Sequence, residues 1–216
     1  MARIARLVVP HYPHHITQRG NRRQQTFFSS DDYQAYIDLL SFHAQKLAVG
    51  IWAYCLMPNH VHIVAVPTNE SGLSKCLSRT HRAYALKVNK RNEWKGHLWQ
   101  ERFYSYVMDE NHLLSAVRYT ELNPVRAGLC SRPEDWPWSS TAAHLSGDND
   151  QLTEVEPMLE RVENWPSYLA QSYDSEFESI RLHTRTGRPA GKTKFLLQLE
   201  AITGRELRKR KTGPKG

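Results

Sequence analysis

Two histidines separated by a single residue are the most specific chemical signal in this sequence. His60 and His62 lie in the run MPNHVHIV at residues 57–64, whose apolar character is typical of a β-strand. Side chains alternate along a strand, so both imidazoles would project from one face, about 7 Å apart. Two neutral imidazoles placed in this way can bind one metal ion. A histidine pair on a strand is also common as polar surface, and two histidines do not complete a metal site.

A tyrosine and an asparagine could supply what the histidines lack. Tyr119 and Asn123 are four residues apart in a helix predicted at 111–123, so they share one helix face. An asparagine amide oxygen can coordinate a metal ion, and a tyrosine oxygen can act as a nucleophile. Tyr119 also fits the apolar stripe that Leu113 and Val117 form on this helix. Spacing alone leaves open whether Tyr119 is reactive or part of the core.

The elements that must position these residues follow from hydrophobic periodicity and turn signals. We expect strands at residues 14–18, 49–56 and 60–66 with a fourth inside 98–108, and helices at 31–47, 72–90 and 111–123. The order β-α-β-β-α-β-α predicts an α+β fold with an RRM-like or ferredoxin-like antiparallel sheet flanked by helices.

Charge is unevenly distributed along the chain, which has a net charge of +7 and a pI near 9.4. Residues 146–183 hold two arginines against nine acidic residues, and residues 184–216 hold ten Lys or Arg against Glu200 and Glu206. We therefore expect a domain at 1–145, an acidic helical extension at 146–183 and a basic C-terminal tail at 184–216. Positive charge gathered in this way favours a nucleic acid as the partner. A solvated basic surface without a partner is the alternative.

Basic and amide side chains that could contact DNA occur at the turn after the first strand, on the second helix, beside Trp99 and in the tail. These candidates are Arg19, Asn21, Arg22, Arg23, Arg79, Arg82, Arg102, Arg185, Arg188, Lys192, Arg208, Lys209, Arg210 and Lys211. Arginines at a turn are equally compatible with solvated surface, so the pattern alone does not assign them.

Several classes of protein are disfavoured by the sequence. Its three cysteines form no Cys-x-x-Cys pair, which argues against a disulfide framework or a zinc knuckle. We expect no signal peptide and no membrane span, and hence a soluble, cytoplasmic protein. The segment GRPAGKT at 187–193 is one residue short of a phosphate-binding loop and follows no apolar strand, so no nucleotide cofactor is expected. The oligomeric state is not fixed by the sequence, and a monomer is the working expectation.

Four motifs occur in order along the chain: HHITQRGNRR at 14–23, MPNHVHIV at 57–64, LWQERF at 98–103 and RYTELNPVRAGL at 118–129. Together they resemble the REP-associated tyrosine transposases of the single-tyrosine HUH superfamily, over residues 10–140. The resemblance implies an RRM-like catalytic domain in which His60, His62 and Asn123 hold Mg²⁺ or Mn²⁺ and Tyr119 is the nucleophile. Insertion-sequence relatives usually have glutamine as the third ligand, and asparagine resembles the REP-associated branch.

The resemblance also implies an activity. It predicts a bacterial, nucleoid-associated transposase that cleaves and rejoins single-stranded DNA containing hairpins at repetitive extragenic palindromes, through a 5′-phosphotyrosine intermediate. Two alternatives stay open. The chain could be a non-catalytic RRM-like module that binds nucleic acid, or a metal-dependent phosphodiesterase that uses water while Tyr119 is structural.

Overall fold

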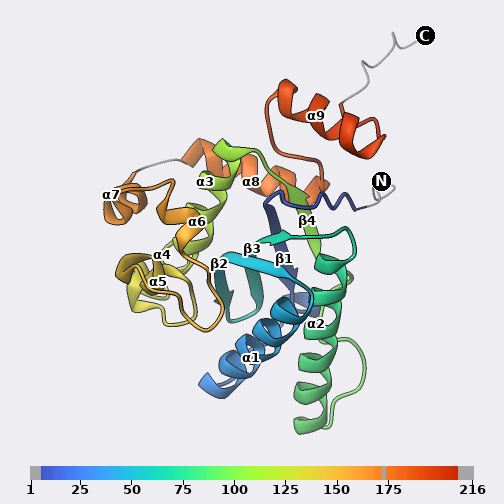
Figure 1. Cartoon of the computed structure of the whole chain (residues 1–216). Coiled ribbons are helices and arrows are strands. Elements are labelled where there is room, and N and C mark those ends of the chain that lie inside the picture. The colour runs from blue at the N-terminus through green and yellow to red at the C-terminus, as the bar shows by residue number, and fades with distance from the viewer. Residues whose placement is uncertain (1–5, 172–173, 209–216) are drawn as a thin grey trace, which may run out of the picture.

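The computed structural model describes residues 6–171 and 174–208 of the chain (Figure 1). Its strands are β1 (His14–Arg19), β2 (Val49–Met57), β3 (His60–Pro67) and β4 (Tyr104–Val107). Its α-helices are α1 (Ser30–Lys46), α2 (Gly72–Arg91), α3 (Glu110–Glu121), α4 (Asn123–Arg126), α5 (Thr141–Ser146), α6 (Glu156–Leu159), α7 (Trp165–Ala170), α8 (Asp174–Thr186) and α9 (Thr193–Thr203). Short 3-10 turns lie at Asn21–Arg23 and Pro133–Asp135.

The four strands form one antiparallel sheet in the order β2-β3-β1-β4. This is the ferredoxin-like arrangement, in which β3 lies between β1 and β2. The register pairs Thr17 of β1 and Cys55 of β2 with His62, and pairs Arg19 with His60. The sequence-based prediction of an α+β fold with this sheet is confirmed.

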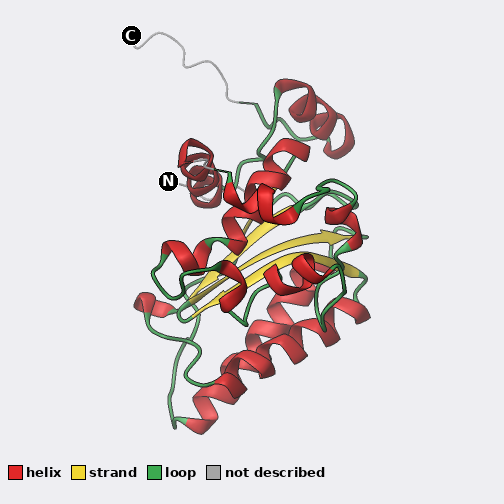
Figure 2. Cartoon of the chain, turned by 90° about the vertical axis from the view of Figure 1, so that its left-hand side faces the viewer, coloured by secondary structure: helices red, strands yellow, loops and turns green. Residues whose placement is uncertain are grey.

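Each face of the sheet is covered by a different group of helices. The core on one face contains Ile16, Val61 and Ile63 of the sheet together with apolar residues of α1 and α2. The core on the other face contains Ala53, Val64 and Tyr106 together with apolar residues of α3 and α8. Figure 1 shows α1 and α2 together below the sheet and α3 and α8 above it, and Figure 2 shows the sheet in yellow between these helices. Alternate residues of β3 therefore face different layers, as the period of a strand requires.

Helices α1 and α2 follow directly from apolar spacing in the sequence. Tyr33, Tyr36 and Leu40 recur at helical intervals on α1 and are buried. The two helices are also joined by Asp32, whose buried carboxylate accepts hydrogen bonds at 2.6 and 3.0 Å from the guanidinium of Arg91 at the end of α2. This layer supports the sheet from the side opposite the histidine pair.

The acidic stretch expected to be helical at 146–183 contains three separate helices, α6, α7 and most of α8. Asn164 begins α7 as its N-cap, with its side-chain oxygen accepting a hydrogen bond from the backbone of Ser167 at 2.8 Å, and Pro166 follows in the first turn. Such a cap and proline start a new helix rather than continue an old one. Each of these helices contributes a buried residue to the core on the sheet face that α3 covers: Met158 of α6, Trp165 of α7 and Phe177 of α8.

The C-terminal helix α9 packs beside the beginning of the described chain. Phe195 and Leu199 of α9 are buried against Leu7, Val9 and Val107. Figure 1 shows α9 at the same end of the molecule as β4. Within the described ranges, the structure contains no helix with the length and apolar character needed to cross a lipid bilayer.

Candidate active site

The histidine pair lies on the face of β3 that α3 covers. The ring centroids of His60 and His62 are 5.0 Å apart, and the rings are inclined at 78°. His62 is 6% exposed, whereas His60 is half-buried at the end of the strand. The alternation predicted from the sequence therefore places both imidazoles at one end of the sheet, on the same side as Val64.

Each histidine has a partner for its Nδ1 atom. Nδ1 of His60 lies 2.6 Å from the side-chain oxygen of Asn59, so this nitrogen donates to an oxygen that can only accept. Nδ1 of His62 lies 3.1 Å from Nε2 of His15, a buried residue of β1. If Nδ1 of His62 donates here as well, the Nε2 atoms of both rings keep their lone pairs for a ligand. This is the usual arrangement around histidines that bind metal ions.

Burial keeps these imidazoles in the neutral form. It lowers the pKa of His60 to about 4, with a further contribution from the positive charge of Arg19. Burial is also the main reason why the pKa of His62 lies well below its ordinary value, and it lowers the pKa of His15 to about 3. At neutral pH all three rings are therefore uncharged, and each has one nitrogen without a proton.

Tyr119 and Asn123 reach the histidines from the end of α3. The ring of Tyr119 lies 5.4 Å from that of His62 and 6.3 Å from that of His15, in edge-on orientations. Asn123 begins α4 one turn further on, and its side-chain amide donates to the backbone oxygen of Tyr119 at 3.4 Å. An amide that donates through its nitrogen leaves its side-chain oxygen available as an acceptor or ligand.

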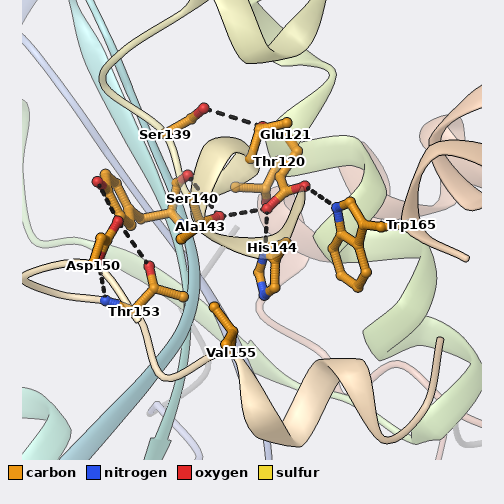
Figure 3. Close-up of polar contacts among 12 residues, drawn as sticks. Thr120, Glu121, Ser139, Ser140, Ala143, His144, Asp150, Thr153, Val155 and Trp165 are labelled. Carbon is orange, nitrogen blue, oxygen red and sulfur yellow. Dashed lines mark hydrogen bonds and ion pairs between the residues drawn. The ribbon is translucent and has the colours of Figure 1, made fainter. Parts of the chain in front are cut away.

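Glu121 lies between Tyr119 and Asn123 and fixes this end of α3. Its side chain is fully buried and accepts hydrogen bonds from Ser140 at 2.5 Å, from Nδ1 of His144 at 2.6 Å and from Nε1 of Trp165 at 2.9 Å (Figure 3). The three donors come from the start of α5, from α5 itself and from α7. A buried carboxylate is tolerated only when it is paired in this way. This network attaches the end of α3 to the helices that follow it.

One cleft of about 590 Å³ brings the predicted residues together. It is lined by His60, His62, Tyr119 and Asn123, and by basic residues that include Arg19, Arg23, Arg181 and Arg185. A larger cavity of about 770 Å³ lies on another side of α3, between that helix and α7, and none of the four residues lines it. The smaller cleft is the candidate active site because chemistry-bearing groups converge there.

A tight turn supplies the basic edge of this cleft. Gly20 donates through its backbone to Asn59 at 2.8 Å, and the side chain of Asn59 donates to the backbone of Arg23 at 3.0 Å. A Cβ atom added at Gly20 would lie only 2.3 Å from the backbone oxygen of Gln24, so the turn requires glycine. Arg22 and Arg23 have φ values of 54° and 62° and are exposed. Of the residues predicted in this turn, Arg19 and Arg23 line the cleft, while Asn21 and Arg22 lie beside it.

The remaining basic candidates are more widely distributed. Arg82 and Arg102 line a second cavity of about 400 Å³ next to α2, which shares Gln18 with the candidate active site. Arg79 is exposed on α2. Outside these two cavities lie Arg188, Lys192 at the start of α9, and Arg208, which pairs with Glu200 at 2.9 Å. Lys209, Arg210 and Lys211 lie outside the described residues.

Sequence reasoning did not identify three residues that contact His62 or Tyr119: His15, Arg126 and Arg181. A usable signal existed for His15, because it shares the period-two face of β1 with Thr17 and Arg19. Arg181 is one of only two arginines in the acidic stretch 146–183. Neither signal shows which residue His15 or Arg181 contacts, because each contact joins two segments that are far apart in the sequence.

Comparison with known proteins assigns the chain to a family. Residues 8–123, more than half of the chain, match the sequence profile of the family described as IS200-like transposases. The chain belongs to this family. The matched residues include both histidines, the tyrosine and the asparagine of the cleft, and they end at Asn123. Helices α5 to α9 of this IS200-like transposase lie beyond the matched residues.

Individual relatives agree with this assignment. A REP-associated tyrosine transposase of Haemophilus influenzae is 24% identical over an alignment of 99 positions that covers 41% of this chain. The match spans 56% of that relative, little more than half of its length. The solved structure of a REP-associated tyrosine transposase bound to a REP hairpin is 20% identical, with a TM-score of 0.59 over 70% of this chain and 90% of that one. At this level of identity the structural likeness shows that the fold is shared.

Membership of the IS200-like transposases raises the question of a metal ion. Within residues 6–171 and 174–208, the structure contains no group of three or more His, Cys, Asp or Glu side chains arranged to bind a metal. The predicted ligands are the imidazoles of His60 and His62 and the side-chain amide of Asn123. This set contains only two residues of those four types, because the third ligand is an asparagine. The orientation of the two Nδ1 atoms and the neutral state of both rings fit the requirements of a divalent ion.

Proposed function

We propose that this IS200-like transposase cleaves and rejoins single-stranded, hairpin-containing DNA, with Tyr119 as the nucleophile. The observation that carries the proposal is the convergence of Tyr119, His60, His62 and Asn123 on one cleft with a basic edge. Because one relative was solved with a REP hairpin, repetitive extragenic palindromes are the substrate that we propose for this chain. The division of the chain at 145 and 183 is part of the same proposal.

In this mechanism His60, His62 and Asn123 would hold Mg²⁺ or Mn²⁺. Such an ion would supply charge neutralisation at the scissile phosphate and at the leaving oxygen. The chain's own residues have two other tasks. Arg19 and Arg23 bind the DNA backbone at the edge of the cleft, and α3 holds the Tyr119 oxygen beside the histidines.

The chemical step conserves the phosphodiester. The Tyr119 oxygen forms a bond to phosphorus and loses its proton, while the bond from phosphorus to the 3′-oxygen breaks and that oxygen becomes a free 3′-hydroxyl. The product is a 5′-phosphotyrosine, from which the reverse attack by a 3′-hydroxyl rejoins DNA. No nucleotide cofactor is needed for either direction.

The test uses a labelled oligonucleotide that carries a hairpin and a single-stranded flank, incubated with Mg²⁺ or Mn²⁺ and separated on a denaturing gel. We expect the native protein to form an adduct that survives denaturation. Tyr119→Phe should bind the DNA but form no adduct, whereas the matched variant Tyr12→Phe, far from the cleft beside Phe195, should behave as the native protein does. Excess chelator should abolish adduct formation.

Three other outcomes would contradict the proposal. Cleavage without an adduct would favour a phosphodiesterase that uses water. Binding without cleavage would favour a non-catalytic nucleic-acid-binding module. Unchanged cleavage in excess chelator would exclude the metal-dependent mechanism.

A further inference from the structure

Helix α8 forms one wall of the candidate active site although it lies beyond the residues that match the family. The family match ends at Asn123, and α8 spans Asp174–Thr186. Phe177 of α8 is buried in the same core as Tyr119, and the two ring centroids are 5.3 Å apart with an inclination of 68°. This is an ordinary edge-on aromatic contact, which anchors the helix against the tyrosine ring.

Arg181 lies one helical turn after Phe177 and therefore on the same face of α8. Its side chain lines the same cleft as that of Tyr119, and a hydrogen bond between the two side chains is the main cause that raises the pKa of Arg181 above its ordinary value. A guanidinium has donors but no acceptor, so the Tyr119 oxygen accepts this hydrogen bond. Arg181 also pairs with Glu178 on its own helix, and it lines the cleft together with His62 and Asn123.

A second arginine contacts the same tyrosine in a different way. The guanidinium carbon of Arg126 lies 5.0 Å from the ring centroid of Tyr119 and 4.4 Å from that of Phe177. This contact is directed at the rings and not at the phenolic oxygen. Of the two arginines, Arg181 is therefore the one whose charge lies at the atom that would react.

We propose that Arg181 is a catalytic residue of this transposase, supplied by the C-terminal helical extension, which holds the Tyr119 oxygen and stabilises its negative charge during attack on DNA. This inference rests on the proposed function of Tyr119. A phenol in water ionises only near pH 10, so an oxygen that must lose its proton gains from a fixed cation at hydrogen-bond distance. Arginine suits this task because its charge is permanent and its donors have a rigid geometry.

The proposal concerns the cleavage step as written above, with the same bonds formed and broken. The Tyr119 proton leaves as the bond to phosphorus forms, and the 3′-oxygen is released as a hydroxyl. Arg181 neither gains nor loses a proton. In the 5′-phosphotyrosine, the guanidinium would lie next to the oxygens of the new phosphate ester, which it can bind through two donors.

The first experiment separates DNA binding from chemistry. Single-turnover adduct formation is measured at saturating hairpin DNA, and affinity is measured by fluorescence anisotropy, for Arg181→Gln, Arg181→Lys and Arg161→Gln. Arg161 is the matched control because it carries an equal charge in the same acidic stretch, is exposed, pairs with Glu110 and lies outside the cleft. We expect Arg181→Gln to slow the single-turnover rate about 10- to 1000-fold, with Arg181→Lys in between. The control should leave both the rate and the affinity as in the native protein.

The second experiment needs no activity. A 3-fluorotyrosine placed at position 119 reports its surroundings through its ¹⁹F resonance. Arg181→Gln should shift this resonance in the DNA-free protein, while Arg161→Gln, outside the cleft, should leave it in place.

The results distinguish the two proposals. If Tyr119→Phe forms no adduct and Arg181→Gln forms it at the native rate, the assignment of Arg181 is wrong while that of Tyr119 stands. If Arg181→Gln weakens binding but leaves the rate at saturation unchanged, Arg181 is only a phosphate contact and the inference is overturned. If Tyr119→Phe still forms the adduct, the proposed function itself fails. An unmoved ¹⁹F resonance in Arg181→Gln would exclude the hydrogen bond on which the inference rests.

Discussion

His62 and His15 face each other across adjacent strands, with 3.1 Å between Nδ1 of the first and Nε2 of the second. Neither ring can be replaced without leaving the other with an unpaired nitrogen in a buried place. His15 therefore orients the imidazole of His62, and this role can be tested directly.

We expect His15→Leu to weaken the binding of Mn²⁺ about 10- to 100-fold, as is usual when a partner of a metal-binding histidine is removed. Isothermal titration calorimetry in the absence of DNA measures this affinity. His97→Leu is the control, because His97 is exposed and lies away from the candidate active site. Equal affinities of the native protein and His15→Leu would show that His15 does not support a metal ligand.

Glu121 supports a prediction about stability. Glu121→Ala leaves the donors of His144 and Trp165 unpaired in a buried site, whereas the Ser140 hydroxyl keeps the backbone oxygen of Tyr54 as an acceptor. Each unpaired donor costs about 1–3 kcal/mol. We expect a loss of at least about 2 kcal/mol in the free energy of unfolding, measured by urea denaturation. The control Glu110→Ala removes a solvent-exposed partner of Arg161 and should cost about 1 kcal/mol or less. Similar losses in both variants would mean that the network does not fix the end of α3.

The turn after β1 predicts an effect on DNA binding. In Gly20→Ala the new Cβ would collide with the backbone oxygen of Gln24, so the turn that carries Arg22 and Arg23 must move. We expect weaker binding of hairpin DNA in an anisotropy titration and an unchanged affinity for Mn²⁺. Gly147→Ala is the comparison for backbone strain without a collision, since Gly147 has a φ of 82° but a Cβ there would meet no atom within 4 Å; it should leave the DNA affinity unchanged. Native-like DNA affinity in Gly20→Ala would argue against a role for this turn.

We expect the basic tail to make the affinity for DNA depend on salt concentration. Residues 209–216 contain Lys209, Arg210, Lys211 and Lys215. If these four charges each neutralise a phosphate of a single strand, they contribute about −3 to the slope of log affinity against log salt concentration. Deletion of 209–216 should therefore flatten the slope by about this amount, whereas deletion from residue 184 would also remove Phe195 and Leu199 from the core. An unchanged slope would show that residues 209–216 do not contact the DNA.

Much of the fold could be predicted because the local patterns and the tertiary structure agree. Tyr36 and Leu40 mark the buried face of α1, and the alternation from His60 to Val64 marks the two faces of β3. Tyr119 and Asn123 share a helix face in the sequence pattern and line one cleft in the structure. These relationships depend on residues only two to four positions apart, which is the range that periodicity can describe.

The rest of the candidate site could not be predicted, because it depends on packing between distant segments. His15 contacts His62 only because β1 pairs with β3 in one particular register. Phe177 and Arg181 reach Tyr119 only because α8 folds back over α3. The domain boundaries at 145 and 183 stay predictions. Helix α8 runs across the boundary at 183, because it spans Asp174–Thr186.

The position of α8 late in the chain has a consequence for synthesis on the ribosome. Translation adds about 5–20 residues per second, so the roughly 60 residues between Tyr119 and Arg181 take about 3–12 s to make. During that interval a nascent chain carries the histidine pair and the tyrosine without the arginine that contacts the tyrosine oxygen. A gene interrupted within this stretch would likewise encode the sheet and the turn at Asn21–Arg23 without that arginine. Such a product would also lack Phe177 and Ile180, the residues of α8 that complete the core around Tyr119.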